Sequence, residues 1–308
     1  MIVRERPNGL QLLLVLRGSI MPRISRVLFF NVVLATLVTL THGALFQFKV
    51  TLTAIPFTLI GLPLAIFLGF RNTAAYDRYW EARKLWGELV LRSRNLARQC
   101  LHMIDPPAAG NRDLRPVMVR RAVAFCHALR LQLRGAGNVA DIAAMLDPQE
   151  WQSVQASSNR PAALMMNMGA DLAACRRAGQ VDGTMVAHVD ASLSAMTAAA
   201  AACERILSTP VPFSYTLLLH RTAYAYCFLL PFGLVDTLGF MTPVVVAIVA
   251  YTFFGLDALG DEIEEPFGSE PNDLPLDAIC RTIEINLREA LGETDLPPAL
   301  LPVDYCLM

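Results

Sequence analysis

The side chains that usually carry catalysis or bind metals are scattered along this 308-residue sequence. Its five histidines include no pair spaced four residues apart, and its seven cysteines include no C-x-x-C. The H-E-x-x-H, P-loop, G-x-G-x-x-G and G-x-S-x-G motifs of zinc, nucleotide and serine chemistry are absent as well. The sequence therefore predicts neither an enzyme nor a metal or cofactor site, and the cysteines are expected to be buried and reduced.

Acidic residues inside a membrane helix would indicate a proton or ion relay. Asp236 is the only candidate within the apolar segments, and we expect it in a turn outside the hydrocarbon core. The acids that follow these segments (Asp261, Glu262, Glu264 and Glu265) are expected to form salt bridges with cytoplasmic arginines at a subunit interface. This distribution argues against a coupled transporter.

Leu62, Ile66 and Phe70 recur every four residues and therefore lie on one side of a helix. Such a stripe has two interpretations. It packs against lipid or neighbouring helices, which is the more frequent case, or it lines a narrow apolar pore that controls ions by excluding water. The spacing alone leaves both interpretations open.

The elements that position this stripe are predicted to cross a membrane. Hydrophobic residues make up 54% of the chain and charged residues 17%, whereas soluble domains carry about a quarter charged residues. Segments 27–45 and 52–70 contain no charged residue and have about the 20 residues that a crossing needs, so they predict a helical hairpin. Segment 222–256 predicts two shorter helices with a turn at 236–242. Four crossings result.

The arginines predict the orientation, because positive charge marks the cytoplasmic flanks of membrane spans. Five precede the first span and four basic residues follow the second: Arg4, Arg6, Arg17, Arg23 and Arg26, then Arg71, Arg78, Arg83 and Lys84. We therefore expect both termini in the cytoplasm and the chain in the inner membrane of a bacterial cell. The net charge of −1 argues against a nucleic-acid partner.

Between the two apolar pairs lies a polar region with helical patterns at 76–103, 114–133 and 185–207. The predicted fold class is an all-α membrane protein. Its segments are a cytoplasmic N-terminus at 1–26, a transmembrane hairpin at 27–70, a cytoplasmic helical region at 71–221, a second transmembrane pair at 222–256 and a cytoplasmic C-terminus at 257–308.

Three motifs resemble a known family: RNTAAYDRYWEARKLWG at 71–87, ERILSTPVP at 204–212 and PFG at 266–268. In this order, over nearly the whole chain, they resemble the bestrophin family and specifically its bacterial branch. The resemblance implies a homopentameric ion channel in the lipid bilayer that passes monovalent ions. About four transmembrane helices per subunit would continue into a helical cytoplasmic domain around a central pore.

The resemblance also implies roles for individual residues. Leu62, Ile66 and Phe70 match three apolar rings in the pore neck, with Pro63 matching a proline beside the first ring and Leu62 standing where isoleucine is expected. Gly179-Gln180-Val181 matches the pattern at a second, cytoplasmic constriction. Val181 is the candidate for that aperture, and Gln180 is the alternative if the register differs by one residue.

Animal members of this family hold calcium just after the same Pro-Phe-Gly turn. Glu270 and Asp273 match the two side-chain ligand positions, but Pro271 and Asn272 interrupt the acidic run. Calcium usually takes six to eight oxygens, several of them from carboxylates. We therefore expect a degenerate clasp, or a turn that caps the next helix, without calcium dependence.

Two questions stay open in the sequence. Apolar rings favour neither sign of ion, so anion (chloride) and cation conduction are not distinguished. The alternative function is a secondary transporter or a membrane-anchored helical scaffold, in which the stripe would only pack. A transporter would be expected to show inverted repeats, and the sequence has no internal symmetry.

Overall fold

The computed structural model describes residues 1–4, 9, 15–16, 18–42, 44–45, 48–49 and 52–308. Arg6 and Arg17, which contributed to the predicted orientation, lie outside the described residues. The chain forms two compact units. Unit 1 contains residues 1–4, 80–209 and 266–308, and unit 2 contains residues 5–79 and 210–265.

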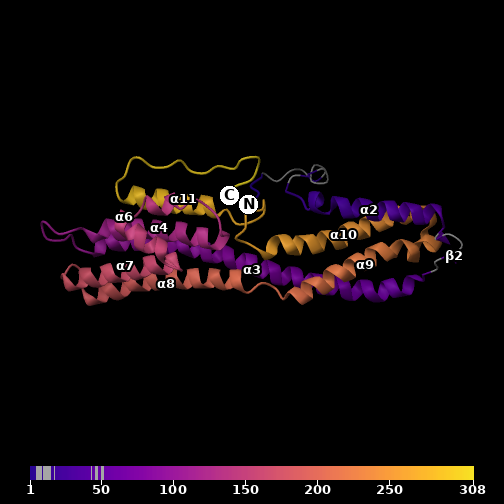
Figure 1. Ribbon diagram of the computed structural model, residues 1–308, viewed down its shortest axis with the longest axis horizontal. Coiled ribbons are helices and arrows are strands. Elements are labelled where there is room, and N and C mark those ends of the chain that lie inside the picture. The colour runs from indigo at the N-terminus through magenta and orange to yellow at the C-terminus, as the bar shows by residue number, and fades with distance from the viewer. Residues whose placement is uncertain (5–8, 10–14, 17, 43, 46–47, 50–51) are drawn as a thin grey trace. The chain divides into compact units, whose positions relative to one another are not determined.

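Unit 2 is built mainly from helices (Figure 1), and these helices are apolar. They are α2 (Met21–Leu40), the first part of α3 (Ala54–Met103), α9 (Phe213–Leu238) and α10 (Thr242–Glu264). The short strands β1 (Ala44–Leu45) and β2 (Phe48–Lys49) pair antiparallel between α2 and α3. The 3-10 turn η1 (Gly239–Met241) separates α9 from α10 and lies within the turn predicted at 236–242. Asp236, which was expected in that turn, lies in the last turn of α9 instead.

Small and aromatic side chains bring the helices of unit 2 together. Ile24 of α2 packs with Cys227 of α9 and with Ala250 and Phe254 of α10 in one buried cluster. The amide of Asn31, fully buried on α2, donates to the Cys227 carbonyl at 2.9 Å. Because a polar group in an apolar helix bundle must find a partner, this bond fixes α2 against α9.

α3 packs against α9 through a close approach at Gly233. Phe57, Leu64 and Leu68 are the buried side chains on this face of α3. A Cβ atom at Gly233 would lie 2.2 Å from Cε2 of Phe57, so a residue without a side chain is needed there. This packing fixes the rotation of α3 about its axis, and with it the direction in which the apolar stripe points.

Unit 1 surrounds the second part of α3 with further helices. These are α4 (Leu114–Arg134), α5 (Ala140–Ala143), α6 (Pro148–Ala156), α7 (Arg160–Arg177), α8 (Gly183–Ser208) and α11 (Leu276–Ala290). The helices predicted at 114–133 and 185–207 are confirmed.

α4 is the central helix of unit 1, and residues 121–131 are buried without interruption. Asp113 caps its first turn by accepting from the Arg115 backbone N–H at 3.0 Å, and Gly135 ends it with a φ of 66°. Buried Arg130 contacts Asp141 at 2.8 Å and Asp277 at 2.9 Å. Charged residues are therefore tolerated in this core because each has a partner.

Four stretches of the described chain are long and apolar enough to cross a membrane: α2, α3, α8 and residues 213–264, which contain α9 and α10. The last stretch has 52 residues, enough for two crossings. α8 has the lowest mean hydropathy, 1.2, and much of that value comes from the alanines at 198–202. Its predicted cytoplasmic position stays a prediction. The all-α fold class with apolar spans is confirmed.

Candidate functional site

The predicted neck residues form an exposed stripe on α3. Leu62, Ile66 and Phe70 are 66%, 47% and 62% exposed in the single subunit. At about 100° per residue, this stripe points roughly 180° away from the buried side of the helix. That buried side is formed by Phe57, Leu64, Leu68, Arg71 and Ala75. The stripe therefore does not pack within its own subunit.

The surface on this side of α3 is apolar over several turns. Ile55 and Leu59 continue the stripe toward the start of the helix, and both are exposed. The Phe67 and Phe70 rings contact each other edge to face, with centroids 6.3 Å apart. So large an apolar face must be covered by lipid or by other subunits, or must border a narrow lumen. Bulky apolar groups around a lumen would impede ions by dewetting.

Arg71, the residue after the stripe, lies in a charged cluster on the opposite side of α3. Its side chain is 0% exposed, and Nη1 lies 2.9 Å from Oδ1 of Asp257. Nη2 pairs with Asp261 and lies 3.6 Å from Oε2 of Glu264. His220 of α9 reaches the other oxygen of Asp257, with Nδ1 at 2.6 Å from Oδ2. One guanidinium is thus shared by three carboxylates.

This cluster corrects one expectation from the sequence. Asp261 and Glu264 were predicted to pair with arginines at a subunit interface, but both pair with Arg71 of the same subunit. The physical reason is that a buried guanidinium needs carboxylates close by to offset its desolvation. The three acids of α10 are spaced at i, i+4 and i+7, and so lie on one face. In the sequence, this spacing and the arginine at the end of an apolar span were the features from which the cluster could have been predicted.

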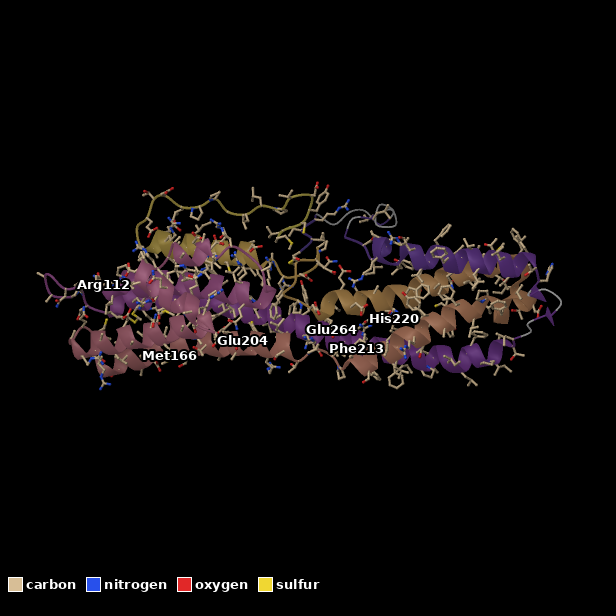
Figure 2. All side chains as sticks on the ribbon, viewed as in Figure 1. Arg112, Met166, Glu204, Phe213, His220 and Glu264 are labelled. Carbon is tan, nitrogen blue, oxygen red and sulfur yellow. The ribbon has the colours of Figure 1, made fainter. Side chains whose placement is uncertain are left out.

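Arg78, within the motif at 71–87, and Val211, in the turn at 210–212, both contact Glu264. The Arg78 Nε donates to the Glu264 carbonyl at 3.2 Å. The Val211 backbone N–H donates to Oε1 of the Glu264 side chain at 3.1 Å. Figure 2 labels Glu264 and His220 in this region of unit 2. Residues far apart in the sequence are therefore joined at the end of α10.

The two aperture candidates differ in their surroundings. Val181 is 7% exposed and belongs to the core of unit 1. Gln180 is half-buried, and its side-chain amide donates to the Asp105 carbonyl at 3.1 Å. A side chain that lines a lumen must be accessible in the subunit, and of the two candidates Gln180 is the more accessible. The position of a cytoplasmic aperture at Val181 or Gln180 stays a prediction.

Glu270 and Asp273 form a turn. The Glu270 N–H donates to Oδ2 of Asp273 at 2.6 Å, and the Asp273 N–H donates to the Glu270 carbonyl at 3.0 Å. Asp273 is buried, whereas Glu270 is exposed. In the part of the chain that the structure describes, no group of three or more histidines, cysteines or acids is arranged to hold a metal ion. Calcium independence stays a prediction.

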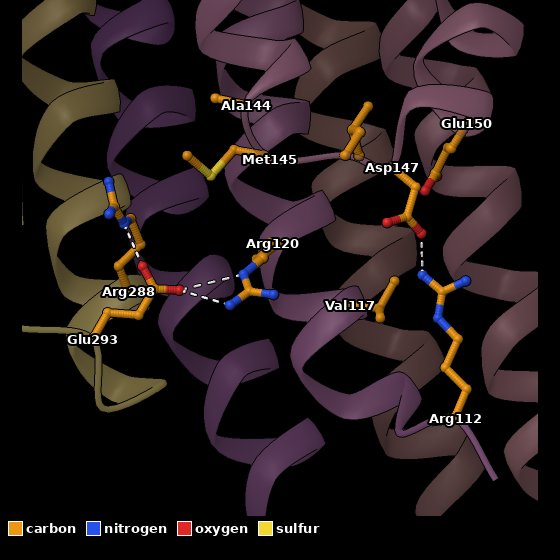
Figure 3. A pocket seen from close by; sticks show the side chains of 10 residues that line it. Arg112, Val117, Arg120, Ala144, Met145, Asp147, Glu150, Arg288 and Glu293 are labelled. Atoms are coloured by element: carbon orange, nitrogen blue, oxygen red, sulfur yellow. Dashed lines mark hydrogen bonds and ion pairs between the residues drawn. The ribbon is translucent and has the colours of Figure 1, made fainter. Parts of the chain in front are cut away.

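A polar cavity of about 490 Å³ lies in unit 1 between α4, the segment that leads from α5 into α6, and the end of α11 (Figure 3). Arg120 and Arg288 both bind Glu293, at 2.9 Å and 2.7 Å, and Arg112 pairs with Asp147. Burial alone would raise the pKa of Glu293, but the two arginines outweigh it and hold this pKa below its usual range. Three arginines and three acidic residues line the cavity, so their formal charges sum to zero.

Comparisons with known proteins agree with this geometry. Residues 1–289 match the family model described as Bacterial/Fungal Bestrophin protein. A voltage-dependent anion channel-forming protein of Mesorhizobium japonicum is 48% identical, over 99% of this chain and 96% of that protein. One of Escherichia coli K12 is 41% identical, over 98% of each chain. A crystal structure of a bacterial bestrophin homologue from Klebsiella pneumoniae matches with a TM-score of 0.82 and 38% identity, over 88% of this chain and all of that one.

Proposed function

The chain is a member of the bacterial and fungal bestrophin family, and on that premise we propose that its copies assemble into a passive, anion-conducting channel. We assign it to the inner membrane, with both termini in the cytoplasm, from the positive charge flanking the spans. Its relatives are named as channel-forming proteins rather than as enzymes, which agrees with the absence of catalytic motifs.

The observation that carries this proposal is the exposed apolar stripe of α3. Leu62, Ile66 and Phe70 point away from the rest of their own subunit. One stripe per chain cannot enclose a lumen, so several copies must contribute one each. Five copies are what the family resemblance implies. Each residue then supplies one apolar collar, and the three collars form the neck.

We place a second constriction at Gln180, because its amide is accessible and Val181 is buried. The apolar neck sets a barrier of dehydration for ions of either sign. Anion permeation is supported by the names of the relatives, which are described as voltage-dependent anion channel-forming proteins. The sign of the permeant ion would then be set by charged groups outside the neck.

Purified protein in a planar bilayer tests this function. We expect unitary currents, and in asymmetric KCl a reversal potential displaced toward the chloride equilibrium potential. Displacement toward the potassium equilibrium potential would contradict anion conduction but would still agree with an ion channel. Saturable flux without unitary currents would indicate a transporter instead. Native mass measurement in detergent should give five copies of the 33.8 kDa chain, and a monomer or dimer would contradict the assembly.

A further inference from the structure

We infer that the polar cavity of unit 1 binds a small zwitterion, a molecule with a carboxylate at one end and an ammonium group at the other. The formal charges that line the cavity sum to zero, but the ion pairs separate them into a positive wall and a negative wall. The inference rests on contacts within unit 1 and is independent of the proposed ion conduction.

The positive wall lies between α4 and α11. Arg120 and Arg288 both bind the one carboxylate of Glu293, at 2.9 Å and 2.7 Å. Three arginines and two acids form and back this wall through shared contacts: Arg120, Arg281, Arg288, Glu284 and Glu293. With His127, 3.3 Å from Glu284, counted as neutral, the formal charge of this group is +1. Within the described part of the chain, Nη1 of Arg120 has no hydrogen-bond acceptor, and so it is free to bind a carboxylate.

The negative wall lies around the start of α6. Arg112 pairs with Asp147, while Arg121 of α4 pairs with both Glu150 and Asp171. Two arginines thus face three acids, and the formal charge of this group is −1. The wall continues into an adjoining cavity of about 380 Å³, which shares Arg112, Asp147 and Glu150. Oδ1 of Asp147 and Oε2 of Glu150 accept no hydrogen bond from any described residue, and so they are free to bind an ammonium group.

The pKa shifts of the acids agree with this division. On the positive wall, Arg288 and Arg120 hold the pKa of Glu293 below its usual range, although burial opposes them. On the negative wall, burial raises the pKa of Asp171, and the nearby charge of Glu150 adds to this effect. The pairing of Asp171 with Arg121 does not offset the two. The negative wall therefore lacks a positive charge, which an ammonium group would supply.

Apolar side chains complete the lining of the cavity. They belong to Val117 of α4 and to residues 144–146, and Figure 3 shows the Val117 side chain between Arg120 and Arg112. Methylene groups of a ligand would pack against these side chains, and a cavity of about 490 Å³ has room for a molecule the size of an amino acid.

A molecule with a single charge matches only one of the two walls. An anion bound to Arg120 is repelled by the acids of the opposite wall, and a cation bound to Asp147 is repelled by the arginines. A zwitterion places its carboxylate on Arg120 and its ammonium group on Asp147 and Glu150. An ω-amino acid with a short unbranched chain has this chemistry.

Thermal melting of the purified protein in a non-ionic detergent tests the inference, because a ligand that binds the folded state raises Tm in a saturable way. The probes are glycine, 4-aminobutanoate and 6-aminohexanoate, which separate the two charges by increasing lengths. Butanoate and butylamine carry one charge each and serve as controls. We expect at least one amino acid to raise Tm at concentrations up to about 10 mM, and the single-charged controls to bind at least about tenfold more weakly. No saturable shift with any of the three amino acids, or equal affinity for butanoate or butylamine, would overturn the inference.

Substitutions on each wall locate the binding site. Arg120→Gln and Asp147→Asn change side chains that are roughly half exposed, so the fold should survive, and each should weaken binding of the amino acid at least about tenfold. The control Arg205→Gln breaks another exposed ion pair of unit 1, with Glu81 at 2.6 Å, and should keep the native affinity. Native affinity in either cavity variant would show that its wall does not hold the ligand and would overturn the inference. No current is measured, so a failure of the proposed channel leaves this test unaffected.

Discussion

At the scale of single residues, exposure distinguishes the two sides of α3. Leu64 and Leu68 are buried against α9, whereas Leu62, Ile66 and Phe70 are exposed. The two sets have similar chemistry, and so their different surroundings predict different consequences of truncation.

Replacing Leu62, Ile66 and Phe70 together by alanine should give a leaky channel that still folds. Widening the collars lowers the steric and dehydration barriers, and we expect at least about tenfold more resting current. The permeability ratio should change little because no charge is altered. Bilayer recording and Tm in detergent are the measurements.

The matched control is the double variant Leu64→Ala and Leu68→Ala. It leaves cavities in the core and should lower the free energy of unfolding by about 2–5 kcal/mol per site. An aggregated neck variant would show that its stripe packs against protein or lipid. A well-folded neck variant with native gating would show that the gate lies elsewhere, most directly at Gln180.

Substitutions at Gln180 and at Val181 should likewise differ in their effects on permeation and on stability. Gln180→Ala should change conductance or permeability ratios with little change in Tm, because its amide is accessible. Val181→Ala removes two buried methyl groups and should cost about 2 kcal/mol of stability without changing permeation. Altered permeation in Val181→Ala alone would restore the original assignment.

At the scale of elements, the packing of α3 against α9 requires a glycine at position 233. Gly233→Ala would drive a methyl group into the Phe57 ring, and overpacking of this kind costs about 1–3 kcal/mol. Gly169→Ala on α7 is the control, because a Cβ there meets no atom within 4 Å. Melting in detergent should rank Gly233→Ala below native protein and Gly169→Ala at or above it. Equal Tm values for the two variants would contradict the close approach.

At the scale of the whole molecule, much of the fold could be predicted from long uncharged segments and from breaks between helical patterns. The turn before α10 followed from the length of segment 222–256, which exceeds one crossing. The Arg71 cluster could not be predicted, because its partners lie 186 and 190 residues away. The burial of Val181 next to an accessible Gln180 could not be predicted either, because it depends on tertiary packing, which a local motif does not specify.

Calcium removal should leave activity intact. Oδ2 of Asp273 already accepts a hydrogen bond from the Glu270 N–H, and two acidic residues supply too few oxygens for a calcium site. Currents recorded before and after chelation should agree. Loss of current that micromolar calcium restores would show a working clasp at Glu270 and Asp273.

The most direct test of the pore assignment is the accessibility of a cysteine placed on the stripe. The native background is favourable, since six of the seven cysteines are buried and only Cys306 is partly exposed. Ile66→Cys should let a charged, water-soluble thiol reagent reduce the current irreversibly. Leu68→Cys, buried against α9, and Ile248→Cys, exposed on α10, should leave the current unchanged. Unaltered current in Ile66→Cys, together with labelling of that cysteine only by a lipophilic maleimide, would place the stripe against lipid and contradict the pore.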